Sequence, residues 1–400
     1  MDIYALICSP ENIEKAYDSV LKSMREASRA QRGSCRAFAK KLDYYSSHKP
    51  DVLAQISTRL RPSGELAFRR FITKIPKKPS GPRIRPISLF SFEERVILRA
   101  TLNILWPILE PVIVPSICYC TFRKDGLHPP RGTVAATLEL ANARKSAEYF
   151  VLKSDIAGFF DNIDRTMLVA QISKLVPDLA AIKLLECVLF CESEFDNSYF
   201  LDHEKILSTK GVPQGSALSP ILACIFLSPF DGLMSSRGIK IIRYVDDLAI
   251  LADSLETALT LEGELIEVLG QQFGGLQLSK HKTIISTPRE SVEFLGHLVH
   301  GDGRISPSPS RKASVRKWIF SLIEQLPGRP DSIVVSELSS YLIGYFHSMS
   351  HCNFTDKQYS DFGVLIGDAL ERRGLDRKRL SRMLRKSSKK WPDAFLEGLP

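Results

Sequence analysis

The chain has 400 residues, which is too long for one small domain and predicts two or three packed units. A hydrophobic fraction of 44% is that of an ordinary folded protein and argues against a disordered chain. The formal net charge of +9 is compatible with a polyanionic partner, although basic composition alone does not require one.

The eight cysteines have no spacing typical of a zinc finger. The pairs Cys118-x-Cys120 and Cys187-x3-Cys191 stand without matching Cys or His partners, so we expect reduced, buried thiols rather than a metal site or a disulfide framework. The first residues carry acids and do not resemble a signal peptide. No apolar run looks long enough to span a bilayer, so we expect a soluble cytoplasmic protein without membrane contact.

The first half of the chain is predicted to combine helices with one hairpin. Apolar residues recur at helical spacing in 10–34 and 47–64. Two β-rich arms, 67–76 and 83–89, flank the turn sequence KKPSG and predict a basic β-hairpin. Further helices are expected over 91–113 and 133–149, with a loop between them.

The second half begins with a strand at 149–155 that runs into a turn, followed by helical segments from 165 to 192. The turn sequence GVPQGSALSP opens a buried helix, and IIRYVDDLAIL reads as a buried hairpin. The remaining expected elements are a helix at 254–274, strands within 276–286 and 292–305, and helices from about 311.

Three acidic residues lie in apolar strands, where carboxylates are costly. Asp155 ends the strand that starts at 149, and Asp246 and Asp247 are adjacent in the hairpin. Such a cluster is tolerable if hard divalent cations neutralise it. Two cations held close together stabilise the attacking and leaving oxygens in phosphoryl transfer. The three acids therefore indicate a metal-dependent nucleotidyl transferase.

The motifs around these acids resemble those of reverse transcriptases of the bacterial group II intron and retron type. KSDIAGFFDNID, GVPQGSALSP, RYVDDLAIL, LQLSKHKT and EFLGHLV follow one another in the family's order, and IPKKPSGPRIRPISLFS and TFRKDG precede them. The resemblance covers about 66–305. It implies an α+β right-hand polymerase with fingers, an antiparallel palm sheet backed by helices, and a helical thumb.

The resemblance also implies domain boundaries and catalytic roles. The expected domains are an N-terminal helical extension (1–65), fingers (66–150), a palm (151–305, with a fingers insertion around 165–210) and a thumb (306–400). Asp155 and Asp246 would be the main ligands of two Mg²⁺ ions, which Mn²⁺ could replace, with Asp247 as accessory acid. Ile156 would add its backbone carbonyl, and Lys282 would protonate the pyrophosphate leaving group.

Further residues are expected to bind substrates. The triphosphate would be held by basic residues of the predicted hairpin, namely Lys78, Arg83 and Arg85, with Lys77 as a near-equivalent. Phe160 would be a steric gate that excludes the ribose 2′-hydroxyl, whereas Phe159 would be a core aromatic. Gln214 and Gly215 would bring backbone close to the nascent base pair. The expected template and primer contacts are Arg123, Tyr244, Leu295, Gly296, Arg377 and Arg382.

The implied activity is RNA-directed DNA synthesis, in which dNTPs extend a 3′-hydroxyl on an RNA template. Retron enzymes usually carry a His where this chain has Ser146, and a Val-Thr-Gly element after the fifth motif that is absent here. The chain ends soon after the expected thumb segment begins, so we expect none of the DNA-binding and endonuclease extensions that many group II intron proteins carry. We therefore expect a free-standing bacterial enzyme of the antiphage defence type, which copies an associated structured non-coding RNA.

Several alternatives stay open at the level of sequence. The chain could be a retron or group II intron-type enzyme, an untemplated or protein-primed DNA polymerase, or a non-catalytic RNA-binding scaffold. An RNA-templated RNA polymerase is disfavoured by Phe160 and by the Tyr-Val-Asp-Asp form of the hairpin. Partners could include a second copy of the chain or an accessory protein.

Overall fold

The computed structural model describes 2–30, 36–61, 68–76, 84–120, 131–195, 210–324, 331–354 and 356–371. Its contacts divide the chain into two compact units. Unit 1 comprises Met1–Gly126, Ser154–Asp246 and Thr260–Lys282, and unit 2 comprises Leu127–Lys153, Asp247–Leu259 and Thr283–Pro400. The boundaries expected for fingers, palm and thumb stay a prediction.

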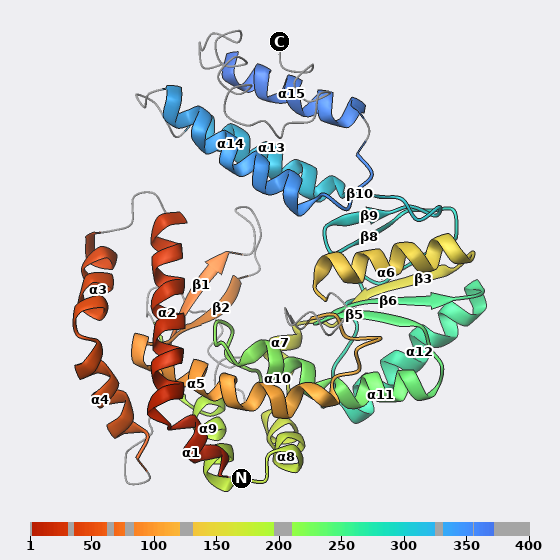
Figure 1. The fold of residues 1–400 in the computed structure, drawn as a ribbon. Helices are drawn as coiled ribbons and strands as arrows, with labels where there is room; N and C mark the ends of the chain where they lie inside the picture. The colour runs from red at the N-terminus through yellow and green to blue at the C-terminus, as the bar shows by residue number, and fades with distance from the viewer. Residues whose placement is uncertain are drawn as a thin grey trace. The chain divides into compact units, whose positions relative to one another are not determined.

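Unit 1 begins with four helices: α1 (Ile3–Ile7), α2 (Pro10–Ala30), α3 (Arg36–Ser47) and α4 (Lys49–Arg59). The residues of α2 that are buried recur every three or four positions, as an amphipathic helix requires: Ile13, Ala16, Tyr17, Val20, Leu21 and Met24. This apolar stripe packs on α5 (Phe92–Leu109), and Figure 1 shows the two helices beside each other. Ser91 and Glu94 begin α5 with a capping box.

The predicted basic hairpin is present in unit 1. Strands β1 (Arg69–Pro76) and β2 (Ile84–Leu89) pair antiparallel, with Phe71 opposite Leu89. Strand β4 (Glu192–Phe195) adds to β1 in parallel, which gives the order β2-β1-β4. The hairpin's turn residues lie outside the described part of the chain.

Short helices complete unit 1: η1 (Glu110–Val112), α7 (Phe159–Asn162), α8 (Arg165–Leu175), α9 (Leu179–Leu189), α10 (Ser219–Phe226) and α11 (Ser228–Ser236). The expectation that no apolar run could span a membrane needs a correction. The window Ser219–Ser236 is long and apolar enough by composition, although 61% of it is buried. It covers α10 and α11, and every residue of α10 except Pro220 is buried, as in the core helix of a folded unit.

A four-stranded sheet carries the predicted acids. Its order is β5-β6-β3-β7, from β5 (Ile241–Tyr244), β6 (Asp247–Ala252), β3 (Phe150–Asp155) and β7 (Ile284–Ser286). Strands β3 and β7 pair antiparallel, with Val151 opposite Ser286. The strand expected across 276–286 is shorter than predicted, because only its last three residues form β7 and Leu278 makes an isolated bridge to Ile156.

Unit 2 contains a small antiparallel sheet and several helices. The sheet order is β10-β9-β8, from β8 (Val292–Phe294), β9 (His297–Val299) and β10 (Ile305–Pro307), and α6 (Thr133–Ser146) packs against β9. Helix α12 (Leu255–Gln272) follows β6 in the chain. Helix α13 (Pro309–Glu324) contacts α14 (Asp331–Ser348) and α15 (Asp356–Glu371), as Figure 1 shows. Trp318 and Tyr341 stack between α13 and α14 with ring centroids 3.5 Å apart.

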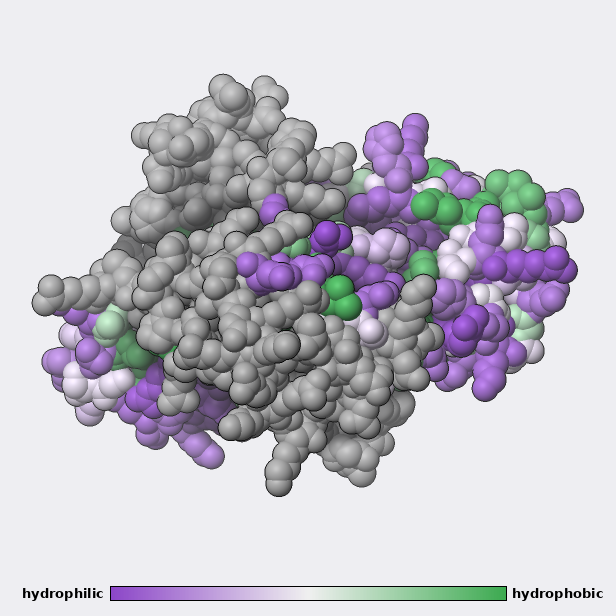
Figure 2. Space-filling model, turned by 90° about the horizontal axis from the view of Figure 1, so that it is seen from above, coloured by the Kyte–Doolittle hydropathy of each residue, from purple (hydrophilic) through white to green (hydrophobic). Residues whose placement is uncertain are grey.

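The face drawn in Figure 2 is mainly hydrophilic among the residues that are coloured, and hydrophobic side chains appear there in small separate groups. Scattered apolar residues of this kind are normal on folded proteins. The described part of this face therefore presents polar and charged groups to its surroundings.

A fully buried ion pair supports the strand that leads to Asp246. The Arg243 guanidinium donates two hydrogen bonds to the Asp231 carboxylate on α11, and both side chains are 0% exposed. A third bond runs from Arg243 Nη1 to the Val245 carbonyl at 2.9 Å. Burial lowers the pKa of Arg243, but Asp231 outweighs burial, so the pKa is raised above its usual value. The pair ties β5 and the turn after it to α11.

Replacing Asp231 by Ala should destabilise unit 1 by about 3 to 5 kcal/mol, because the Arg243 charge would remain buried without its partner. Urea unfolding, followed by circular dichroism, measures this loss. The matched control is the double variant Asp231→Leu/Arg243→Met, which removes both charges and should recover most of the stability. Equal destabilisation of the single and double variants would contradict the ion-pair argument.

Candidate active site

The structure brings the three predicted carboxylates together. Asp155 is the last residue of β3, Asp246 lies in the two-residue turn between β5 and β6, and Asp247 begins β6. One carboxylate oxygen from each lies within 4.8 Å of the others. Asp155 is 7% exposed, and Asp246 and Asp247 are half-buried. Hard oxygen donors at this spacing suit a divalent cation.

Backbone hydrogen bonds fix Asp155 and Asp246 relative to each other. The Ile156 N–H donates to the Asp246 carbonyl at 3.1 Å, and the Ser279 N–H donates to the Asp155 carbonyl at 2.7 Å. The turn itself is strained, because Val245 adopts a φ of 59°, which is rare for a β-branched residue. Strain of this kind persists where the surrounding structure over-determines it and is common at functional sites.

Lys282 lies against the first acid. Its Nζ forms an ion pair with the Asp155 carboxylate, and the side chains are 43% and 11% exposed respectively. The Lys282 backbone N–H donates to the Ser279 carbonyl at 2.8 Å. Lys282 therefore supplies one positive charge to a cluster of three negative ones. The sequence predicted Lys282 as a proton donor, and this contact adds a direct link to Asp155.

Phe160 and Phe159 differ in the way the sequence predicted. Phe159 is 1% exposed and belongs to the core, whereas Phe160 is half-buried, with the two ring centroids 5.7 Å apart. The Phe160 carbonyl accepts a hydrogen bond from the Val212 N–H at 2.8 Å. Helix α7 therefore presents Phe160 five residues after Asp155, next to the start of the GVPQG turn.

The GVPQG turn is docked on two elements. Gln214 Nε2 donates to Asp161 Oδ1 at 2.7 Å, and the Gln214 carbonyl accepts from the Ser88 N–H of β2 at 2.6 Å. Gly215 has a φ of 108°, and a Cβ there would lie 2.7 Å from the Ser88 carbonyl oxygen. The close backbone approach that requires glycine is therefore to β2, whereas the predicted approach to a base pair stays a prediction.

The predicted triphosphate contacts are only partly described. Arg85 lies in β2 opposite Ile75, which places its backbone in the hairpin. The other basic and C-terminal candidates lie outside the described residues: Lys77, Lys78, Arg83, Arg123, Arg377 and Arg382. Their roles stay predictions, as does that of Tyr244, which is half-buried at the end of β5.

In unit 2, Leu295 and Gly296 form the tight turn between β8 and β9. Their φ values are 51° and 78°, as a two-residue hairpin turn requires. A Cβ at Gly296 would lie 3.1 Å from Arg311 Nη1. A shallow pocket of about 320 Å³ opens here, lined by Gly296, Arg311, Tyr341 and Tyr345 among others. Sequence reasoning missed Arg311. The basic pair Arg311 and Lys312 near the start of α13, soon after the predicted primer contacts, could have indicated it.

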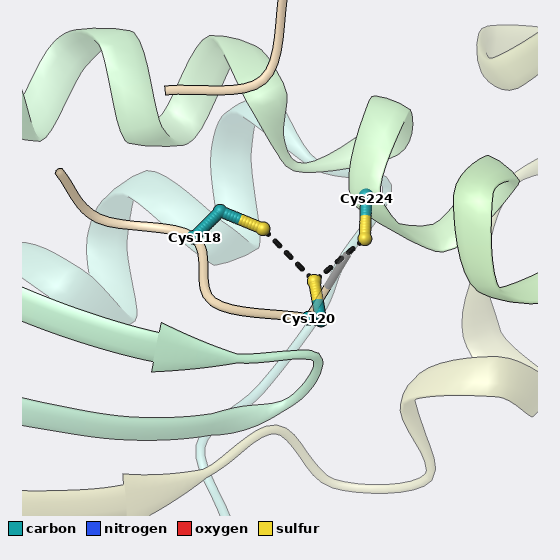
Figure 3. Close-up of side chains that lie close together, drawn as sticks. All are labelled: Cys118, Cys120 and Cys224. Atoms are coloured by element: carbon teal, nitrogen blue, oxygen red, sulfur yellow. Dashed lines mark hydrogen bonds between the residues drawn. The ribbon is translucent and has the colours of Figure 1, made fainter. Parts of the chain in front are cut away.

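Sequence reasoning also missed two clusters of donor atoms. Cys118, Cys120 and Cys224 lie within 4.8 Å of one another in unit 1, and Figure 3 shows their sulfur atoms turned toward each other. His297, His351 and Cys352 lie equally close in unit 2, with the two Nε2 atoms 2.9 Å apart. Burial lowers the pKa of His297 to about 4, and the neighbouring charges of His351 and Arg311 add smaller effects in the same direction. Spacing rules for metal-binding motifs detect neither cluster, because in each cluster the third member is distant in sequence from the other two.

Comparison with known proteins agrees with this geometry. The family model described as "Reverse transcriptase (RNA-dependent DNA polymerase)" matches residues 75–299. The group II intron-encoded protein LtrA of Lactococcus lactis is 29% identical over 167 residues, which are 42% of this chain and 25% of LtrA. Protein YkfC of Escherichia coli is 24% identical, over 60% of this chain and 70% of YkfC.

Two further matches are informative. The retron Ec86 reverse transcriptase of Escherichia coli is 33% identical over 92 residues, 22% of this chain and 28% of that protein. Apo telomerase from Candida tropicalis has the same fold with a TM-score of 0.51 at 12% identity, over 84% of this chain and 63% of the telomerase chain. The family match covers more than half of the chain, and the chain therefore belongs to the reverse transcriptase family of RNA-directed DNA polymerases.

Proposed function

We propose that the cluster of Asp155, Asp246 and Asp247 is the catalytic centre and that it extends a primer 3′-hydroxyl with dNTPs on an RNA template. The observation that carries this proposal is the convergence of three carboxylates, from the end of one strand and from one hairpin, within 4.8 Å. Family membership supports the reaction class. The matched segment is 25% of LtrA, so no activity that depends on the rest of LtrA is assigned to this chain.

The donor set fits divalent cations, and we assign Mg²⁺, with Mn²⁺ as a substitute. Asp155 and Asp246 would hold two ions, with Asp247 and the Ile156 carbonyl as additional oxygen donors. Ions bound there would lower the pKa of the primer 3′-hydroxyl and neutralise charge on the phosphates. The protein supplies the rigid placement of the carboxylates through the backbone bonds of Ile156 and Ser279.

Replacing Asp246 by Ala should abolish dNTP incorporation while RNA binding is retained, because one of the two main metal ligands is lost. Asp247→Ala should have a smaller effect, since Asp247 is assigned as an accessory donor. Primer extension on a defined RNA template, with Mg²⁺ titrated from zero, measures both. Asp253, a carboxylate outside the cluster, gives the matched control Asp253→Ala. Unchanged incorporation by Asp246→Ala would overturn the proposed centre.

Two roles for Lys282 can be separated by experiment. As a proton donor to pyrophosphate, Lys282 should contribute about a hundredfold to the rate, so Lys282→Ala should lower kcat with the Mg²⁺ dependence unchanged. If Lys282 served only as a charge partner of Asp155, its removal should lower the Mg²⁺ concentration that gives the half-maximal rate, because the carboxylate would lose a cation that competes with Mg²⁺. We expect the loss in kcat, and Lys282→Arg tests whether a non-titrating charge suffices.

Phe160→Ala should admit ribonucleotides, because the ring that would contact a 2′-hydroxyl is removed. The measurement is the ratio of kcat/KM for a dNTP to that for the matching rNTP, which should fall at least tenfold. Phe159→Leu is the control, since Phe159 is a core residue and should change stability rather than sugar choice. An unchanged ratio in Phe160→Ala would remove Phe160 from the gate role.

We further propose that the template is a structured non-coding RNA and that the enzyme acts in the cytoplasm in antiviral defence. This proposal follows from the resemblance of the motifs to bacterial reverse transcriptases, whereas the similarity to a retron enzyme supports the reaction class alone. The test is to sequence the RNA that co-purifies with the active protein and with Asp246→Ala/Asp247→Ala, and to challenge cells expressing each with phage. A random RNA population, or equal phage resistance in both strains, would reject this assignment while leaving the polymerase activity intact.

A further inference from the structure

Three cysteines form a compact cluster behind the catalytic hairpin. The Cys120 sulfur lies 2.8 Å from the Cys118 sulfur and 2.6 Å from the Cys224 sulfur. Figure 3 shows Cys120 in the middle, with Cys224 approaching from α10 and the other two from the segment after η1. Cys118 and Cys224 are buried and Cys120 is half-buried.

The cluster is connected to the hairpin that carries Asp246. The Val245 backbone is among the groups that lower the pKa of Cys120, and Val245 is the residue with the strained φ in the turn before Asp246. The backbone of Cys118 pairs in parallel with Arg243, and the Tyr119 N–H donates to the Arg243 carbonyl at 2.9 Å. The segment that carries Cys120 is therefore bonded to the strand that leads to Asp246.

The environment favours one thiolate and two thiols. Hydrogen bonds from Cys118 and then Cys224 lower the pKa of Cys120 well below its usual value, and the Arg243 charge adds to this effect. The same contacts raise the pKa of Cys224 well above its usual value, as burial also does. A thiolate with a lowered pKa that is flanked by a thiol is an arrangement found in reactive cysteines.

A metal ion explains the cluster less well than sulfur chemistry does. Two thiolates on one tetrahedral zinc ion lie about 3.8 Å apart, given a Zn–S distance of about 2.3 Å. The sulfur atoms here are about 1 Å closer than that. Three thiolates on a divalent ion would also leave a net negative charge in the core, where Arg243 is already paired with Asp231.

We propose that Cys120 is a peroxide-reactive cysteine and that Cys224 resolves it to a reversible disulfide that slows DNA synthesis. Cys224 is the nearer sulfur and lies on a different element, whereas the backbone of Cys118 is held by its isolated bridge to Arg243 of β5. The disulfide would link α10 to the segment beside β5 and would remove the Cys120 thiolate.

The chemistry balances with hydrogen peroxide as the oxidant. The Cys120 thiolate attacks one peroxide oxygen, the O–O bond breaks and hydroxide leaves, which gives a sulfenic acid. The hydroxide takes the Cys224 proton to form water, and the Cys224 sulfur then attacks the Cys120 sulfur. The S–O bond breaks and a second hydroxide leaves. Together the two cysteines lose two electrons, which reduce one molecule of peroxide. A dithiol reductant then cleaves the disulfide and restores both cysteines.

The first experiment identifies the bond. The purified protein is treated with hydrogen peroxide, its free thiols are alkylated, and tryptic peptides are examined by mass spectrometry without reduction. We expect a crosslink between the peptides that contain Cys120 and Cys224, which persists in Cys118→Ser and disappears in Cys224→Ser. A Cys118–Cys120 bond in the wild type, or irreversible oxidation of Cys120 with no crosslink, would overturn the assignment. Stoichiometric zinc or copper lost in Cys120→Ser would also overturn it, in favour of a metal site.

The second experiment measures the consequence. Peroxide should lower the primer-extension rate of the wild type by about tenfold or more, because a shift of about 1 Å at a catalytic group costs about a hundredfold. Dithiothreitol should restore the rate. Cys224→Ser should keep the reduced-state rate under peroxide, whereas the control Cys187→Ser, outside the cluster, should stay sensitive. Inhibition of Cys224→Ser equal to that of the wild type would overturn the proposal.

Discussion

Mutual repulsion among three carboxylates is the constraint on which the rest of the site depends. Oxygen atoms of Asp155, Asp246 and Asp247 lie within 4.8 Å of one another, and like charges at this distance repel. Main-chain hydrogen bonds from Ile156 and Ser279 hold the backbones of Asp246 and Asp155 in place, and side-chain repulsion does not easily break them. In the proposed function, bound cations would offset this repulsion, and the ammonium group of Lys282 already offsets part of the charge.

The catalytic hairpin relies on polar support from within the core rather than on packing alone. Arg243, one residue before the Tyr-Val-Asp-Asp sequence, is fully buried against Asp231 and also bonds to the Val245 carbonyl. The carbonyl of the strained residue Val245 is therefore satisfied by a buried side chain, and the surrounding structure supports its φ of 59°.

Much of the fold and of the candidate site could be predicted because the signals are local. The hairpin of β1 and β2, the amphipathic stripe of α2 and the hairpin of β5 and β6 follow from alternation, helical spacing and motif, whereas Asp246, which was expected in a strand, lies in the turn. The family resemblance identified Asp155, Asp246 and Asp247 as one set, and the predicted strands that carry them are neighbours in the sheet. The length of the strand expected over 276–286 was overestimated. The apolar pattern of this segment does not reveal that Leu278 makes only an isolated bridge.

What sequence could not predict depends on distant contacts. The ion pair of Lys282 with Asp155 joins residues 127 positions apart, and the contact of Cys120 with Cys224 joins residues 104 positions apart. Cysteine spacing was therefore a misleading guide, because the segment that carries Cys118 and Cys120 meets Cys224 of α10, which is distant in sequence. The buried Arg243 was equally hidden, since its partner on α11 belongs to a helix that reads as apolar core.

The link between β2 and the GVPQG turn has a mechanical consequence. The Ser88 N–H holds the Gln214 carbonyl, the Gln214 amide holds Asp161, and Asp161 is the neighbour of Phe160. These bonds connect the hairpin expected to bind the triphosphate with the helix that carries Phe160, whose ring is proposed to exclude the 2′-hydroxyl. Because a Cβ at Gly215 would lie 2.7 Å from the Ser88 carbonyl oxygen, the GVPQG turn packs tightly on β2, and a displacement of β2 would move the turn with it. With these two proposed roles, the position of the hairpin and the choice of sugar would be coupled.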